Sequence, residues 1–277
     1  TAGINGLQNR ADLIARNTPG VEVKEILLPT GALYGQVDLI PDVTFEAYYQ
    51  YEWKKTELNG VGSYFSDRDF LGPGAVNFLI PVGPDSVSAI SRTADESASS
   101  SGQWGSALHW ITSGGTDLGL YYINAHSKAP AYQVNYPPGG IFPESYTIRY
   151  FEDIQGYAAS FTTVLGSTNV QGEVSYKTDV PVVLLSGDPV PGDLASYQLG
   201  GSYVLEPTRL WDDATLVFEL AGAYVTSQDS AELTFDDHGT VTARRTLTPG
   251  PGTSIVDLEP RIHHTYCALA PDTVILE

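Results

Sequence analysis

Four glutamates, Glu46, Glu52, Glu173 and Glu219, lie in segments where apolar and polar residues alternate, and each takes the polar side. A pair of carboxylates hydrolyses a glycosidic bond when the two groups converge on one cleft at about 5–10 Å. A polar strand face that lines a water-filled lumen also explains glutamates at these positions. We favour the lumen over a glycosidase site.

The sequence offers little evidence for a nucleophilic catalytic site or a metal site. A serine nucleophile usually sits in a Gly-x-Ser-x-Gly turn, and the chain has no such motif. Of the five histidines, His109 and His126 fall at opposite ends of one expected hairpin, opposite Gly119 and Gly102. The adjacent pair 263–264 would point to opposite faces of a strand. We therefore predict no catalytic residue, no metal site and no cofactor.

The charge balance restricts the partners of the chain. With 14 Lys+Arg against 33 Asp+Glu, the net charge of -19 disfavours nucleic acid. Acid pairs at 95–96, 212–213 and 236–237 lack the pattern of an EF-hand, so we expect solvated loop charge, with weak divalent cation binding as a hypothesis. A single cysteine, Cys267, excludes an intramolecular disulfide.

The elements that position these residues are mostly strands. Residues 1–20 are expected to form a short helix or linker, because Leu7, Ala11 and Ile14 have helical spacing before Pro19. No apolar run reaches the roughly 20 residues of a membrane helix. From Leu33 onward the period becomes two, and residues 21–277 are expected to form one all-β domain.

Hairpin turns fix the pairing of the expected strands. Residues 33–39 and 43–53 bring their apolar sets to one face if Leu39 pairs with Val43 across the turn. Gly166-Ser167 predicts a two-residue turn that pairs Leu165 with Thr168, and therefore Tyr157 with Tyr176. Further strands are expected at 103–111, 117–126, 146–151, 197–205, 215–226 and 231–235, with long polar loops at 54–102, 127–145, 178–194 and 227–260.

Long two-faced strands, with tight turns alternating with long loops, are typical of an antiparallel meander in an outer-membrane β-barrel. Aromatic residues crowd the strand ends, and we predict an aromatic girdle from Tyr49, Trp53, Trp104, Trp110, Tyr157, Tyr176, Tyr197, Tyr203 and Tyr224. The predicted lumen lining is Glu46, Gln50, Glu52, Gln171, Glu173, Ser175 and Lys177. Alternation also describes a soluble sandwich, so the face that meets lipid stays open.

Several runs carry a family resemblance: LPTGALYGQV at 28–37, EAYYQYEW at 46–53, GSYFS at 62–66, DFLGPG at 69–74, GLYYINAHS at 119–127 and GEVSY at 172–176. Over about residues 20–205 the chain resembles a proteobacterial family filed as domain of unknown function 1302. The resemblance implies longer outer-membrane proteins of no established activity, associated with exporters and with breakdown of hydrophobic compounds. The chain is then expected to be a fragment whose barrel is incomplete.

The function expected from these observations is a non-enzymatic conduit in the outer membrane of a Gram-negative bacterium. Its partners would be outer-membrane lipid and a small hydrophobic or amphipathic solute. Two alternatives stay open: a secreted or periplasmic β-rich hydrolase acting on esters or glycans, and a soluble β-sandwich binding module.

Overall fold

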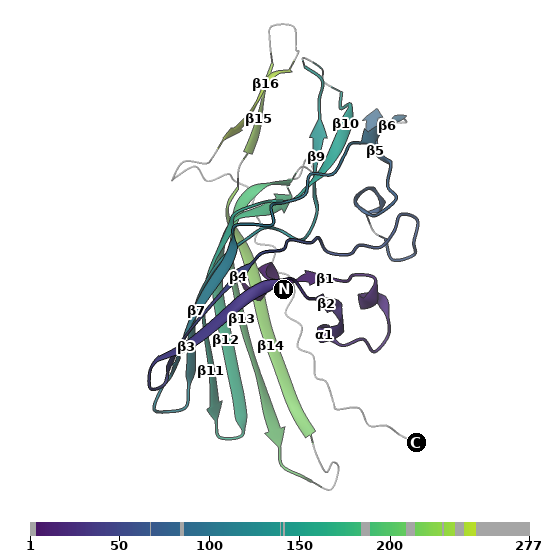
Figure 1. The fold of residues 1–277 in the computed structure, drawn as a ribbon. Helices are drawn as coiled ribbons and strands as arrows, with labels where there is room; N and C mark the ends of the chain where they lie inside the picture. Colours follow the sequence, from purple (N-terminus) through teal and green to yellow (C-terminus); the bar gives the residue numbers. More distant parts are fainter. Residues whose placement is uncertain are drawn as a thin grey trace.

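The largest part of the structure, a computed structural model, is a sheet of eight long strands in the order β14-β13-β12-β11-β8-β7-β4-β3 (Figure 1). The described residues are 4–247 except 67, 84–85, 139, 141, 184–188, 209–213, 229 and 236–240. The strands are β3 (Ala32–Ile40), β4 (Val43–Gln50), β7 (Gln103–Ile111), β8 (Asp117–Ala125), β11 (Ile154–Leu165), β12 (Thr168–Val183), β13 (Pro189–Leu205) and β14 (Ala214–Gln228). All neighbours are antiparallel and follow chain order, so the predicted all-β antiparallel meander is confirmed.

Tight turns join β3 to β4, β7 to β8 and β11 to β12 at one end of the sheet (Figure 1). In the β11–β12 hairpin Leu165 pairs with Thr168 and Tyr157 with Tyr176, which is the predicted register. Gly166 has φ +63°, a conformation that a side chain disfavours, so glycine sets this turn. The predicted pairing of His109 with Gly119 across β7 and β8 is also confirmed.

The β3–β4 hairpin departs from its predicted register near the turn. Val37 pairs with Phe45 as expected, but a bulge between Asp38 and Ile40 makes Ile40, not Leu39, the partner of Val43. The extra residue of a bulge stays unpaired and shifts the next side chains to the other face. Strand β4 also ends at Gln50, so the expected strand over 43–53 is too long.

A smaller sheet lies beyond the other end of the long strands (Figure 1). Its order is β5-β6-β10-β9, with β5 (Asn77–Gly83), β6 (Ser86–Arg92), β9 (Ala131–Asn135) and β10 (Ser145–Arg149); β6 and β10 are parallel. Strands β15 (Ser230–Phe235) and β16 (Val241–Leu247) form a separate hairpin. The segments expected as long polar loops therefore contain strands of their own.

An aromatic cluster holds the smaller sheet together. Tyr146 is fully buried, and Phe70 stacks on Phe78 with ring centroids 4.2 Å apart. Trp53 meets Tyr150 edge to face at 4.7 Å and donates a hydrogen bond from Nε1 to the carbonyl oxygen of Ser127, 3.2 Å away. Trp53 thus belongs to this core, and it does not extend strand β4.

The N-terminal segment, defined here as residues 4–30, consists of short elements and does not form one helix through Leu7, Ala11 and Ile14. It contains η1 (Ile4–Leu7), β1 (Arg10–Ala11), η2 (Ala15–Asn17), α1 (Val23–Ile26) and β2 (Leu27–Leu28), and β1 pairs with β2. Asp12 Oδ1 accepts hydrogen bonds from the backbone N–H groups of Ile14 and Ala15, both 2.9 Å away. A side chain that accepts hydrogen bonds from nearby backbone N–H groups in this way stabilises a turn at the expense of a continuing helix. No described helix is long and apolar enough to cross a membrane.

A buried lysine lies where strand β8 leads into the smaller sheet. Lys128 is 5% exposed, and its Nζ donates hydrogen bonds to Gln103 Oε1 at 2.6 Å and to the His126 carbonyl oxygen at 3.0 Å. Both acceptors are neutral, so they offset burial of the charge only in part. Burial accordingly lowers the pKa of the Lys128 ammonium from 10.5 to about 8.

This pKa shift predicts a rise in stability with pH. Above pH 8 the folded chain releases a proton that the unfolded chain keeps until about pH 10.5, so rising pH favours the folded state. Lys128 by itself should contribute a rise of up to about 2 kcal/mol in the free energy of unfolding in detergent between pH 8 and 10. Lys177, whose pKa burial also lowers, acts in the same direction, and tyrosines with a raised pKa, such as Tyr150, act in the opposite one. Lys128→Met should therefore reduce the slope by the contribution of Lys128. An unchanged slope in the variant would assign the effect to other groups.

Candidate functional site

One face of the eight-stranded sheet is apolar and exposed. Its large side chains are Leu33, Val37, Phe45, Tyr49, Trp104, Leu108, Trp110, Leu118, Leu120, Tyr122, Tyr157, Phe161, Val174, Tyr176, Tyr197, Leu199, Tyr203, Leu216, Phe218, Leu220 and Tyr224. Leu120 and Val174, on the inner strands β8 and β12, are 60% and 59% exposed. From Thr168 to Tyr176 on β12, and at the positions paired with them on neighbouring strands, this apolar face carries no charged residue.

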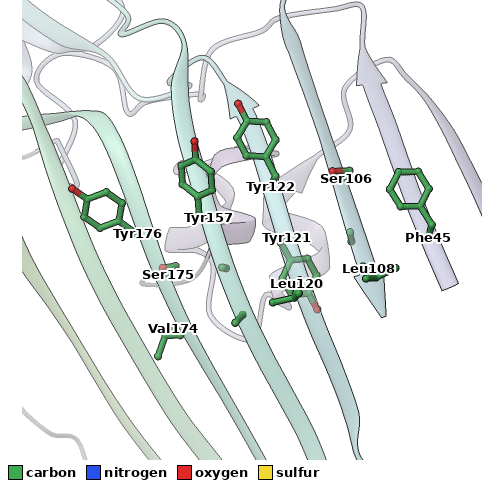
Figure 2. A pocket seen from close by; sticks show the side chains of 13 residues that line it. Phe45, Ser106, Leu108, Leu120, Tyr121, Tyr122, Tyr157, Val174, Ser175 and Tyr176 are labelled. Atoms are coloured by element: carbon green, nitrogen blue, oxygen red, sulfur yellow. The ribbon is translucent and has the colours of Figure 1, made fainter. Parts of the chain in front are cut away.

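Aromatic residues border the apolar face toward the smaller sheet. This aromatic rim comprises Tyr49, Trp104, Tyr122, Tyr157, Tyr176 and Tyr224. The rings of Trp104 and Tyr122 are 4.9 Å apart, and those of Tyr122 and Tyr157 are 5.1 Å apart. Figure 2 shows Tyr122, Tyr157 and Tyr176 in a row across neighbouring strands, above a shallow hollow of about 630 Å³.

The hydroxyl groups of this rim bind polar side chains at its edge. Tyr157 donates to Gln155 Oε1 at 2.8 Å, and Tyr176 donates to Asp193 Oδ2 at 2.9 Å. A tyrosine oriented in this way presents its ring to an apolar medium and its hydroxyl to a wet one. The rim therefore marks a boundary between the apolar face and a polar zone.

The opposite face, called the polar face below, carries the charge of the sheet. Its paired positions include the carboxylates of Asp38, Glu46, Asp117, Glu173 and Glu219, but one lysine, Lys177. Tyr121 and Ser160 share a hydrogen bond of 3.0 Å between their hydroxyl groups on this face. Such an excess of carboxylates favours cations and hydrogen-bond donors near the polar face.

The N-terminal segment covers part of the polar face. Leu7 packs on Ile123, Ala125 and Ala158, and Gln50 Nε2 donates a hydrogen bond to the carbonyl oxygen of Gln8 at 2.9 Å. Two cavities remain between the segment and the sheet, of about 400 and 690 Å³, and Asn9 lines both. These volumes suit a small organic molecule.

The cavities contain several of the predicted lumen residues. Glu46 and Gln50 line the smaller cavity, and Gln171 and Glu173 line the larger one. Ser175 and Lys177 lie on the same face but are buried, 7% and 5% exposed. Glu52 lies beyond the end of β4, where it accepts a hydrogen bond from the Gly31 backbone N–H at 3.1 Å. The pKa of its carboxyl is lowered, chiefly by a hydrogen bond from Lys54.

The predicted girdle residues separate into three groups. Tyr49, Trp104, Tyr157, Tyr176 and Tyr224 belong to the aromatic rim, which also includes Tyr122, a residue outside the prediction. Trp110, Tyr197 and Tyr203 are on the same apolar face but nearer the tight turns. Trp53 lies in the core of the smaller sheet, away from the apolar face.

The residues considered for metal binding do not form a metal site in the described part of the chain. No group of three or more His, Cys, Asp and Glu side chains there could hold a metal ion. His126 Nε2 lies 2.8 Å from the Ser101 carbonyl oxygen, and its Nδ1 accepts the Asp153 N–H. Asp95 accepts hydrogen bonds from the Arg92 guanidinium. The acid pairs at 212–213 and 236–237, His263, His264 and Cys267 lie outside the described residues.

The sequence prediction missed the residues that the N-terminal segment contributes. Asn9, Leu13 and Arg16 line the larger cavity, opposite sheet residues such as Ser160. The segment has no period of two, and its pattern does not say which face of a sheet it covers. Its one usable signal was Leu7, a large apolar residue in the otherwise small or polar run 5–10.

Comparison with known proteins places the chain in a family. The model of a protein family of unknown function, DUF1302, matches residues 1–262, a longer stretch than the predicted resemblance. No curated protein and no solved structure matches. Since the match spans nearly the whole sequence, the chain belongs to the DUF1302 family.

Proposed function

We propose that this chain is part of an outer-membrane β-barrel and that its polar face lines a path for a small amphipathic solute. In this proposal the apolar face meets lipid and the aromatic rim lies at the membrane surface. An open sheet edge leaves backbone N–H and C=O groups unpaired, which hydrocarbon does not tolerate. Strands β3 and β14 would therefore pair with further strands in the membrane.

The observation that carries the proposal is the uncharged, exposed apolar face that ends at the aromatic rim. A soluble sheet that exposed so many large apolar side chains would aggregate or bind a partner. Transmembrane barrels place such a face toward lipid, with tyrosine and tryptophan at the interfaces. The hydrogen bonds of Tyr157 and Tyr176 to Gln155 and Asp193 support this orientation.

The solute path is supported by the polar face and the segment on it. The two cavities flank Asn9, so the N-terminal segment partly fills the space that a lumen would occupy. Outside the segment, its backbone is hydrogen-bonded chiefly to residues 56 and 57, beyond the end of β4, while Leu7 and Gln8 contact the sheet itself. In this proposal the segment moves aside, or leaves space beside it, for a solute. Passage along this face needs no cofactor and no catalytic residue.

Detergent phase separation tests the membrane part of the proposal. The purified chain should partition almost entirely into the detergent phase, and proteoliposomes should take up a fluorescent amphiphile faster than empty liposomes. A monomer that stays in the aqueous phase would contradict the membrane assignment. Membrane insertion without any increase in uptake would contradict the conduit alone.

A further inference from the structure

We infer that the larger cavity binds an amphiphile with an apolar tail and a hydrogen-bond-donating head, an ammonium or a hydroxyl, in preference to an anionic head. The inference rests on the proposed function, because it names the class of solute. Its site is the space of about 690 Å³ between the N-terminal segment and strands β11, β12 and β13.

The two walls of this cavity differ in chemistry. The N-terminal segment contributes aliphatic side chains, among them Leu13, Ile26 and Leu27, whereas the sheet contributes Thr162, Gln171 and Glu173. A wholly apolar ligand would displace water from the polar side chains of the sheet wall without replacing the hydrogen bonds to that water, and a wholly polar ligand would leave the aliphatic wall in contact with water. Only a ligand with both kinds of surface satisfies both walls.

The carboxylates on the polar face set the preferred head group. Glu173 lines the larger cavity, and Glu46 lines the smaller cavity on the other side of Asn9. A carboxylate accepts several hydrogen bonds, so an ammonium or hydroxyl head gains a charge-assisted bond there. A carboxylate or sulfate head would face like charge in a partly desolvated space.

The cation on the other wall does not reverse this preference. Arg16 also lines the larger cavity, but it is exposed to solvent, so water and salt screen its charge. Glu173 is half-buried, and its field is screened less.

Lys177, on the same sheet face, is a second cation near Glu173: burial lowers the pKa of the Lys177 ammonium, and the charge of Glu173 raises it in part. Lys177 is buried, and it is not among the residues that line the cavity, whereas Glu173 is. The charge exposed in the cavity at the sheet wall is therefore that of Glu173, which favours a donor or a cation.

Paired ligands that differ only in the head group test this inference. Binding of decylammonium and decanoate to the purified full chain in neutral detergent should be compared by equilibrium dialysis at pH 7. Decylammonium should bind at least about tenfold more tightly, a difference of about 1.4 kcal/mol. Equal affinity, tighter binding of decanoate, or no binding of either ligand would overturn the inference.

Three variants locate the site. Glu173→Gln should reduce the preference to within about twofold. Asp38→Asn removes the same charge on the polar face, outside both cavities, and should leave the preference unchanged. Leu13→Asn should weaken both ligands equally, because it changes the aliphatic wall. A preference that persists in Glu173→Gln would show that the ligand binds elsewhere.

The outcome is independent of the membrane and uptake tests. Because binding is measured on the solubilised chain, a failure of uptake leaves this measurement intact. Conversely, a chain that inserts and conducts but shows no head-group preference would refute the ligand class and leave the proposed function standing.

Discussion

Val174→Arg should reduce membrane insertion of the chain, whereas Gln171→Arg should leave insertion unchanged. Val174 lies on the apolar face and Gln171 lies on the polar face, three residues away on the same strand, β12. An arginine facing lipid costs about 2–4 kcal/mol at the midplane of the membrane and less toward its surface. Val174 is two residues inside the rim residue Tyr176, so we expect a cost of about 1–2 kcal/mol there and much less for an arginine in the lumen. Unfolding in lipid vesicles and detergent partitioning would measure both effects.

The pair of variants also separates the membrane barrel from a soluble sheet. Val174 is 59% exposed, so in a soluble protein an arginine would meet water there and the free energy of unfolding would hardly change. Equal behaviour of the two variants would therefore contradict the lipid-facing assignment. Both variants introduce an arginine on the same strand, so the two differ chiefly in the face of the sheet that carries it.

The hairpin pairings could be predicted because two independent signals agree. Alternation decides which residues share a face, and a tight turn decides which residues are opposite each other. For the hairpin at Gly166 both signals lead to the same pairs, from Leu165 with Thr168 to Gly156 with Lys177. Local sequence therefore fixes the apolar face before any tertiary contact is known.

The bulge in β3 and the ends of the strands could not be predicted in this way. An alternating pattern has no feature that marks Leu39 as the unpaired residue. Prolines in residues 178–194 indicated a loop, yet β13 begins at Pro189. Pro189 and Pro191 precede the part of β13 that pairs with β14, so among the described residues they pair with β12 alone. A proline, which has no backbone N–H to donate, is tolerated in such a strand end.

The candidate site was only half predictable, because its two walls come from different kinds of sequence. The sheet wall, with Gln171 and Glu173, follows from alternation. The other wall depends on where residues 4–30 lie, and that is decided by tertiary contacts such as Leu7 on Ile123. Ile123 and Ile154 also lie on the polar face, so this face is apolar where Leu7 covers it.

Leu7 is therefore the residue expected to decide whether the N-terminal segment stays on the polar face. It contacts two buried clusters, one around Ile123 and Ala158 and one around Ile154 and Val180. Leu7→Asn removes these apolar contacts and buries an amide, at a cost of about 2–3 kcal/mol. The population with a detached segment should then rise roughly 30- to 150-fold.

Limited trypsin digestion of the chain in detergent would report this detachment. Cleavage after Arg10 and Arg16 should accelerate in Leu7→Asn, because trypsin needs an extended, accessible backbone, and uptake into proteoliposomes should rise with it. Ile14→Asn is the matched control, since Ile14 is 54% exposed, lines neither cavity and belongs to neither cluster around Leu7. If Leu7→Asn accelerated cleavage without any change in uptake, the segment would not obstruct the path. If neither changed, contacts other than those of Leu7 would hold the segment on the polar face.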